Sequence, residues 1–204
     1  MKIEVQQVGQ LMTNCYIVWD ENTKNAAIID PGDDGAYLSD RLRKNGLTLQ
    51  YIFLTHGHFD HITGVPELME TCGTEPKVYM SHKDLNLEAV FHESVALDPE
   101  MVIDWKDGDT VTMDSITFRV LETPGHTPGS VCLIAGDVIF SGDTLFQGSC
   151  GRTDFPGGSW TEMCASLRRL YELKGDYTVL SGHTGSTTLE RERKTNMFMQ
   201  SALG

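Results

Sequence analysis

The sequence has little positive charge: 16 Lys and Arg stand against 29 Asp and Glu in 204 residues, a formal net charge of −13 with histidine neutral. Proteins that grip phosphate backbones need clustered Lys and Arg, and anionic bilayers attract basic segments. We therefore expect neither a nucleic acid nor a membrane as a partner. The chain also lacks any apolar run near the roughly 20 residues that a membrane-spanning helix requires. Residues 1–7 lack the apolar stretch of a secretory signal.

Cysteine is sparse as well, with five residues widely spaced and no C-x-x-C. This pattern is typical of reduced thiols and predicts a cytoplasmic protein without a disulfide framework. Two familiar catalytic motifs are also missing. Without G-x-S-x-G there is no nucleophile elbow of a serine hydrolase. Without G-x-x-x-x-G-K-[ST] the Gly-rich segment at 148–158 is not a phosphate-binding loop.

Histidine is what the sequence concentrates instead. The segment Thr55–His61 reads T-H-G-H-F-D-H and follows the apolar run Tyr51–Leu54, which predicts a buried strand. Apolar residues at helical spacing come next, so we expect a helix near 62–71. The segment is therefore a strand-to-helix loop at the C-terminal edge of a sheet, where open α/β folds place their sites.

Four side chains of this loop are candidate metal ligands. Neutral imidazole and carboxylate together suit zinc, and also iron or manganese. Because His56 and His58 are two residues apart, an extended segment can turn both toward one ion, while Asp60 and His61 could serve a second ion. The alternative is a solvated, histidine-rich loop, and four ligand-type residues directly after a strand argue against it.

Three more residues of ligand type follow later strands. His126 lies in a loop whose prolines and glycines fix the chain path. Asp143 follows the predicted strand 137–140, and His183 follows the predicted strand 177–180. Both halves of the chain thus end strands in residues that can bind a metal.

Other polar residues leave alternatives open. Asp30 ends a predicted strand that begins at Asn25, and we expect it either to orient a metal-bound histidine or to be a simple turn residue before Pro31. His82 and His92 are expected to be surface or locally bonded histidines rather than ligands.

The remaining elements follow from hydrophobic periodicity. Strands are expected at 2–8 and 15–19 as a hairpin, at 78–80, at 111–121 as a second hairpin, and at 131–134. Helices are expected around Leu38 and Leu42, from Ser81 to about Ala89, and from about Leu189. Another helix is expected after the Ser159–Glu162 capping box, and its core-facing residues are Trp160, Met163, Leu167, Leu170 and Tyr171. Residues 92–108 are expected to be a surface connection. The order predicts one α+β domain over residues 1–204, an αββα four-layer sandwich with two mixed sheets face to face and helices outside.

The H-x-H-x-D-H run at His56–His61, followed by His126, Asp143 and His183, resembles the metallo-β-lactamase-fold hydrolases. The single-domain branch related to glyoxalase II (hydroxyacylglutathione hydrolase) looks closest, because the segments at 13–16, 29–32, 123–129 and 141–146 fit it. The resemblance implies two divalent metal ions, zinc first, with iron or manganese as alternatives. It assigns one ion to His56, His58 and His126, the other to Asp60, His61 and His183, and makes Asp143 the bridge. Because only about 20 residues follow His183, no C-terminal glutathione-binding helical domain is expected.

The activity implied is that of a metal-dependent hydrolase, a binuclear thioesterase that cleaves S-lactoylglutathione or a related acyl-thiol with a metal-bridging hydroxide. Asp60 would ligate the second ion and orient that hydroxide. The expected partner is a small anionic acyl-thiol substrate, and the oligomeric state stays open. Arg152 is expected either to grip a substrate carboxylate through a bidentate contact or to pair with Asp154 and shape its loop.

A second activity stays open because of the loop Gly151–Phe155. This loop is similar to that of the persulfide dioxygenase branch and of short bacterial glyoxalase-II-like proteins. The alternative is therefore a mononuclear iron persulfide dioxygenase, an oxidoreductase of the same fold. The two branches share much of the ligand set, so ligand spacing does not separate them.

Overall fold

The computed structural model describes residues 1–87 and 97–204, and most of its strands belong to two six-stranded sheets. The first sheet has the order β1 (Lys2–Val8), β2 (Thr13–Trp19), β3 (Asn25–Ile29), β4 (Thr48–Phe53), β5 (Lys77–Tyr79), β6 (Val102–Ile103). The second has the order β14 (Thr187–Thr188), β13 (Thr178–Ser181), β10 (Val138–Gly142), β9 (Val131–Ala135), β8 (Ile116–Glu122), β7 (Thr110–Met113). A small hairpin, β11 (Leu145–Phe146) with β12 (Ser149–Cys150), extends beside the second sheet.

Both sheets are mixed, and their parallel strand pairs determine at which edge the loops after β4, β10 and β13 lie. β3, β4, β5 and β6 run parallel to one another, while β1, β2 and β3 are antiparallel. In the second sheet β10 and β13 are parallel, so the loops that follow these two strands leave from the same edge. The backbone N–H of Val131, at the start of β9, donates to the carbonyl of Thr55 after β4 at 2.9 Å. This bond joins the matching edges of the two sheets.

The core between the sheets is built from side chains that alternate along each strand. On β4, Phe53 points toward the second sheet, whereas Ile52 points to the outer face of the first. The ring of Phe53 lies 4.9 Å from that of Phe118 on β8 and 5.6 Å from that of Trp105. Such aromatic pairs add to the stability that apolar burial already gives the interface.

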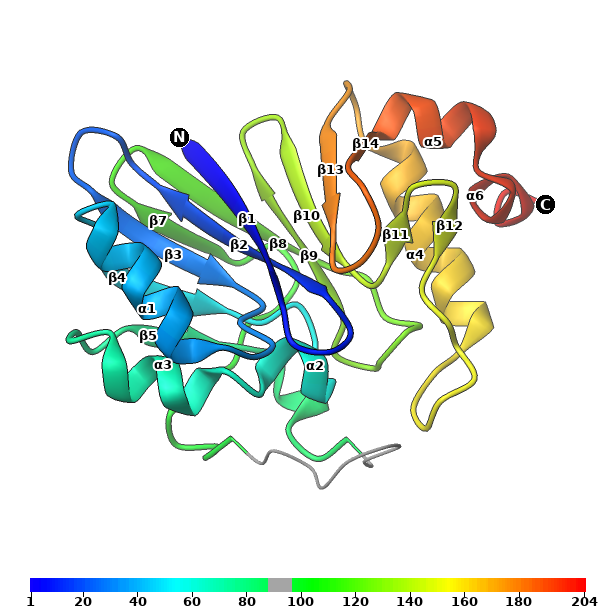
Figure 1. Cartoon of the computed structure of the whole chain (residues 1–204). Helices are drawn as coiled ribbons and strands as arrows, with labels where there is room; N and C mark the ends of the chain where they lie inside the picture. The colour runs from blue at the N-terminus through cyan, green and yellow to red at the C-terminus, as the bar shows by residue number, and fades with distance from the viewer. Residues whose placement is uncertain (88–96) are drawn as a thin grey trace.

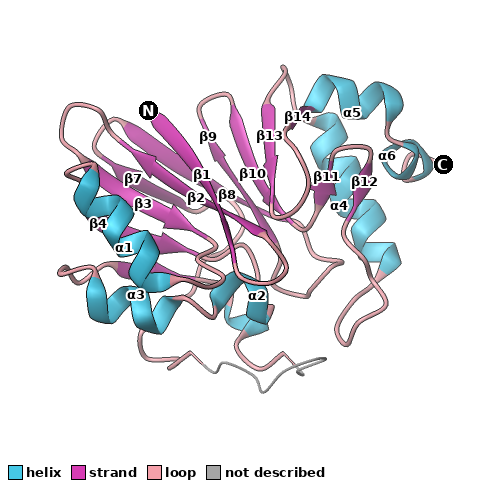
Figure 2. Cartoon of the chain, viewed as in Figure 1, coloured by secondary structure: helices cyan, strands magenta, loops and turns pink. Residues whose placement is uncertain are grey.

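Helices cover the outer faces of the sheets (Figures 1 and 2). On the first sheet lie α1 (Gly35–Lys44) and α3 (Val65–Thr71), which bury Leu38, Leu42, Val65 and Leu68. On the second lie α4 (Trp160–Glu172), α5 (Leu189–Thr195) and α6 (Met197–Ser201), which bury Met163, Leu167, Leu170, Leu189 and Met199. The hydroxyl of Ser159 caps α4 by accepting from the backbone N–H of Glu162, as the capping box predicts. The predicted αββα layering is confirmed.

The helix predicted from Ser81 to about Ala89 is wrong in the described residues. Only a 3-10 helix, His82–Asp84, forms there, and residues 88–96, which include His92, lie outside the described residues. The Asp84 carboxylate in this short helix accepts hydrogen bonds from two loops that are distant in sequence. His82 is locally bonded as predicted, since its Nε2 lies 2.9 Å from the carbonyl oxygen of Val102.

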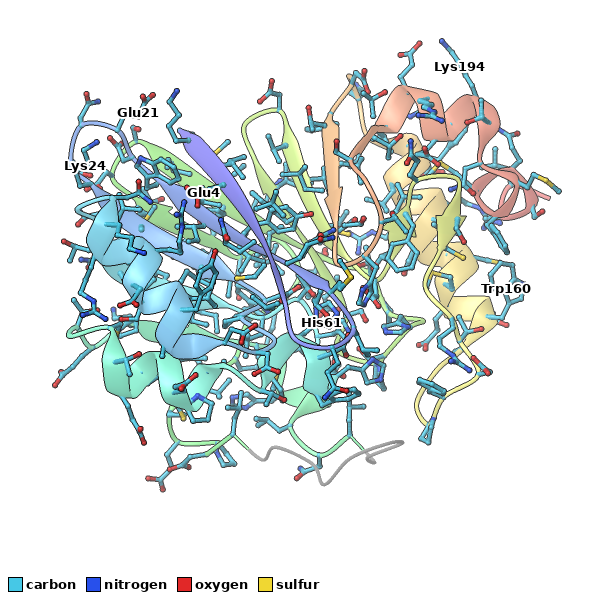
Figure 3. The ribbon with its side chains drawn as sticks, in the orientation of Figure 1. Glu4, Glu21, Lys24, His61, Trp160 and Lys194 are labelled. Carbon is cyan, nitrogen blue, oxygen red and sulfur yellow. The ribbon has the colours of Figure 1, made fainter. Side chains whose placement is uncertain are left out.

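Two tryptophans also differ from the predictions. Trp105, in the segment expected to be a surface connection, is 2% exposed and packs between the sheets. Trp160, expected to face the core, is 44% exposed on the outer side of α4 (Figure 3). Helical side chains tilt toward the N-terminus, so the side chain of this first helical residue extends past the helix and contacts Phe198 instead. Among the described residues, no helix has both the length and the apolar character needed to cross a bilayer.

Candidate metal centre

The seven predicted ligands come from four loops and meet at one edge of the two sheets. His56, His58, Asp60 and His61 lie between β4 and α3, the last two in the short helix α2 (Phe59–Ile62). His126, Asp143 and His183 follow β8, β10 and β13. Figure 3 labels His61 at this edge.

The donor atoms of these side chains form three overlapping groups, in each of which the atoms lie within 4.8 Å of one another. The groups are His56, His58, His126; then His56, His61, Asp143; then Asp60, His61, His183. Asp143 lies in the middle, with Oδ2 3.5 Å from His126 Nε2 and 3.6 Å from His183 Nε2. The structure thus brings together all seven residues that the sequence singles out.

Unpartnered buried atoms show that this cluster fits a cation. His56 Nε2, His61 Nε2 and Asp143 Oδ1 are buried, and none has a hydrogen-bond partner. Leaving a buried polar atom unsatisfied costs about 1–3 kcal/mol, so native structures rarely keep one without a reason. These three atoms belong to one of the three groups and converge on one place. A metal ion accepts lone pairs from all of them and removes the cost.

The electrostatics favour the neutral ligand forms of His56 and His58. Burial, reinforced by the neighbouring imidazoles, holds the pKa of His56 well below its usual range and lowers that of His58 to about 3. Both rings are therefore neutral and keep a free lone pair at neutral pH. At His61 burial lowers the pKa, but Asp30, Asp60 and Asp143 outweigh it and raise the pKa to about 10, so a cation would have to displace a proton from this ring. Burial alone raises the pKa of Asp60, but His61 and the hydrogen bond with His183 outweigh it and hold that pKa below its usual value. Neutral imidazoles beside an ionised carboxylate are the donor set that a borderline divalent ion prefers.

Asp30 orients one of these rings. Its Oδ2 lies 2.9 Å from His61 Nδ1, and a ring that donates there directs the lone pair of its Nε2 into the cluster. The same carboxylate accepts from the backbone N–H and the hydroxyl of Thr55, both at 2.7 Å. Asp30 also has the left-handed φ of a turn residue, which agrees with one of its two sequence-based expectations. Its role toward a metal-bound histidine stays a prediction.

Strand β2 supports the part of the cluster around His183. The hydroxyl of Thr13 donates to Asp60 Oδ2 at 3.1 Å. The amide of Asn14 donates to the carbonyls of Ser181 and Thr184, on either side of His183, at 3.0 and 2.9 Å. These contacts fix the loop after β13 against β2.

Asp84 is a residue that the sequence analysis missed. It is 2% exposed, and its carboxylate accepts three hydrogen bonds, from the backbone N–H of Gly57, the backbone N–H of Gly129 and the hydroxyl of Thr127. These donors are 27 to 45 residues away in sequence. No local pattern signals such contacts, although the predicted cap at Ser81 pointed to a structured turn nearby.

Arg152 lies at the rim of the cluster. Its guanidinium makes a bidentate pair with Asp154, at 2.8 and 2.7 Å, and lies over the ring of Phe155, 3.6 Å from the centroid. Its carbonyl oxygen lies 2.7 Å from His126 Nδ1 and so orients that imidazole. The loop-shaping role of the Arg152 side chain is present in the structure, and a role in binding substrate stays a prediction.

The donor set of this arrangement fits a divalent cation. His56, His61, His126 and Asp143 are buried, while His58 and His183 are partly exposed. A divalent ion bound there would polarise a carbonyl and activate water without a protein nucleophile.

Comparison with known proteins agrees with this geometry. Residues 8–183 match the family described as the metallo-beta-lactamase superfamily. The chain is 36% identical to hydroxyacylglutathione hydrolase GloC of Haemophilus influenzae over 98% of this chain and 99% of that protein.

Two solved structures are also similar. One is ETHE1 from Myxococcus xanthus, 31% identical with a TM-score of 0.80 over 100% of this chain and 91% of that chain. The other is TTHA1623 in a di-iron-bound form, 35% identical with a TM-score of 0.81 over 96% and 99%. By sequence, fold and clustered side chains, the chain belongs to the metallo-β-lactamase superfamily.

Proposed function

We propose that this protein is a binuclear metallohydrolase that cleaves thioesters of small anionic acyl groups, with S-lactoylglutathione or the ester of a related thiol as substrate. The observation that carries the proposal is the set of converging, unpartnered buried donors at His56, His61 and Asp143. The near full-length similarity to GloC, a protein named as a hydroxyacylglutathione hydrolase, supports the choice of reaction. We further propose a cytoplasmic location, which suits the five free thiols.

The metal assignment is part of this proposal. His56, His58 and His126 would hold one ion, Asp60, His61 and His183 the other, and Asp143 would contact both. We propose zinc, with iron or manganese as the alternatives that the same ligands accept. Bound there, two divalent ions would supply Lewis acidity for a substrate carbonyl and lower the pKa of water to about 7. The similarity to a di-iron-bound protein supports the number of ions rather than their identity.

The side chains around the centre prepare it for this reaction. Asp60 stays ionised and is held by the hydroxyl of Thr13 and by His183. Its carboxylate can therefore accept a hydrogen bond from an attacking water molecule and orient that water. Two carboxylates, Asp60 and Asp143, offset only half the charge of two divalent ions. The centre therefore stays positive and attracts an anionic acyl group.

Arg152 supplies the second proposed contact with substrate. Its side chain is 51% exposed, so the guanidinium can leave Asp154 for a carboxylate at little cost. We expect Arg152→Ala to raise KM for an anionic thioester several-fold while kcat changes little, and Arg152→Lys to recover part of the loss. Asp154→Asn serves as the control, because it frees the guanidinium without removing it. An unchanged KM in Arg152→Ala would exclude this residue from substrate binding.

The persulfide dioxygenase is retained as a second candidate because of the Gly151–Phe155 loop. Overall similarity does not choose between the activities, since the chain is 36% identical to GloC and 31% identical to ETHE1. Metal analysis of protein purified without oxygen from medium containing zinc, iron and manganese separates them. Two ions per chain with thioester cleavage support the hydrolase. One iron per chain with O2 uptake on a glutathione persulfide, and no thioester cleavage, refutes it.

A further inference from the structure

The Asp84 carboxylate lies between two loops that are distant in sequence. Its Oδ2 accepts from the backbone N–H of Gly57 at 3.0 Å and from the hydroxyl of Thr127 at 2.6 Å, and its Oδ1 accepts from the backbone N–H of Gly129 at 2.6 Å. Gly57 lies between His56 and His58, and Thr127 directly follows His126. One buried carboxylate therefore contacts the backbone or the neighbours of all three imidazoles of one group.

Gly57 and Gly129 leave room for Asp84, because neither has a side chain that would block its approach. A Cβ on Gly57 would lie 2.6 Å from the backbone oxygen of Asp84, and a Cβ on Gly129 would lie 2.6 Å from its Cγ. Neither glycine has a positive φ, so backbone conformation does not explain them. They give Asp84 the space to approach both loops, which indicates that the close approach is a built feature of the site.

The other group of ligands depends on different contacts. The hydroxyl of Thr13 holds Asp60, and Asn14 holds the loop on both sides of His183. Neither residue contacts Asp84 through a hydrogen bond among the described residues. Asp30 is shared, because it bonds both His61 and Thr55, whose hydroxyl lies 3.1 Å from His56 Nδ1.

We propose that Asp84 is a positioning residue that holds His56, His58 and His126 as one unit through the backbone of their loops. Asp84 thereby sets the metal affinity of the position formed by these three histidines. The metal affinity of the other position is set by the contacts from β2. The inference rests on the metal centre proposed above and adds that the two positions are separately controlled.

A pair of matched variants tests this. Thr127→Val removes a hydroxyl that donates to a buried carboxylate at 2.6 Å. Thr187→Val removes an equivalent hydroxyl, which donates to the buried Glu192 at 2.6 Å in β14. Both changes keep the side-chain shape and should lower the melting temperature of the metal-free protein to a similar extent. Titration with Zn2+ in competition with a chromophoric chelator then measures the two affinities in each variant.

We expect the wild type and Thr187→Val to bind two Zn2+ with the same affinities. In Thr127→Val and Asp84→Asn the affinity of one position should fall about 10–100-fold, the usual effect of losing an outer hydrogen-bond partner of a metal site. Thr127→Ser, which keeps the hydroxyl, should recover it. Thr13→Val should lower the Zn2+ affinity of the other position. At a free Zn2+ concentration where each single variant binds one ion, the double variant Thr13→Val with Thr127→Val should bind none.

The outcomes are distinct. If Thr127→Val keeps both affinities, or loses them no more than Thr187→Val does, Asp84 is a structural residue only and the inference is wrong. If the double variant still binds one ion, the two positions are not separately controlled. If the wild type binds no Zn2+, Fe2+ or Mn2+, the proposed metal centre fails and this inference fails with it. Should Asp84→Asn not fold, the Thr127 and Thr187 variants still decide the question.

Discussion

Gly182, one residue before His183, is a position where one added methyl group would meet two ligand side chains of the centre directly. A Cβ built there would lie 2.6 Å from Cε1 of His61 and closer still to Oδ1 of Asp143, whereas real Cβ contacts essentially never fall under 3.0 Å. Gly182 has no positive φ, so alanine can adopt its backbone without strain. The whole effect of Gly182→Ala must therefore come from displacing groups of the centre.

The size of this displacement sets the expected loss. If the loop keeps its place, Cε1 of His61 must move by about 0.4 Å and Oδ1 of Asp143 by more, which exceeds the roughly 0.2 Å tolerance of metal–ligand distances. Misplacements of about 1 Å typically cost about 100-fold in rate, so we expect kcat/KM for thioester hydrolysis to fall about 10-fold or more. Overpacking should also cost about 1–3 kcal/mol of stability.

The control is Gly185→Ala in the same loop, where the added Cβ meets only the end of the Gln147 side chain at 3.3 Å. Its kcat/KM should stay within about two-fold of the wild type, because a flexible side chain yields easily. The assay is steady-state hydrolysis of S-lactoylglutathione by zinc-loaded enzyme, with metal content and melting temperature measured on the same samples. Wild-type kcat/KM and metal content in Gly182→Ala would refute the placement of Asp143 and His61 beside this loop.

Three further variants test other parts of the structure. In Asp30→Asn the new amide N–H faces at least one of the groups that donate to the Asp30 carboxylate, so the Zn2+ affinity should fall about 10–100-fold. An unchanged affinity in a chelator titration would contradict the orienting role of Asp30 toward His61. Asp20, at the opposite end of β2, has its pKa lowered to about 2 by hydrogen bonds from the Ser115 hydroxyl and nearby backbone. Because its pKa is depressed in the folded state, its stabilising effect is present above the unfolded pKa of about 3.9 and is lost as the pH falls toward 2. Asp20→Asn should thus melt below the wild type at pH 7, with a difference that shrinks between pH 5 and 2; a constant difference would exclude the carboxylate. Leu167→Ala opens a cavity under α4 and should cost about 2–5 kcal/mol in urea unfolding without changing metal stoichiometry; a loss of metal would show that this side of the fold is coupled to the centre.

Sequence alone predicts the parts of this fold that have local causes. Apolar runs bounded by turn residues locate the strands, and the Ser159–Glu162 pair locates the start of α4. The clustering of the seven donors was predictable because each follows a strand, and because the H-x-H-x-D-H run is so specific.

The predictions that failed depend on contacts between distant segments. Asp84 resembles an ordinary helix residue until Gly57 and Gly129 are placed around it. Trp105 lies in a segment without periodicity, and its burial follows only from the packing of Phe53 and Tyr79 across the interior. The start of α4 at Trp160 was predicted correctly, but the contact of this ring with Phe198 of α6 joins segments that are distant in sequence.

The division of the donors between the two sheets has a consequence for how the protein matures. Four of the seven lie in the first third of the chain, but His183 lies near its end. A nascent polypeptide leaving the ribosome thus carries an incomplete set until almost all of it has been synthesised, and the set assembles only when both sheets have docked. Docking of the two sheets therefore comes before the full donor set exists, so a cation that needs donors from both sheets can bind only after their apolar faces have met.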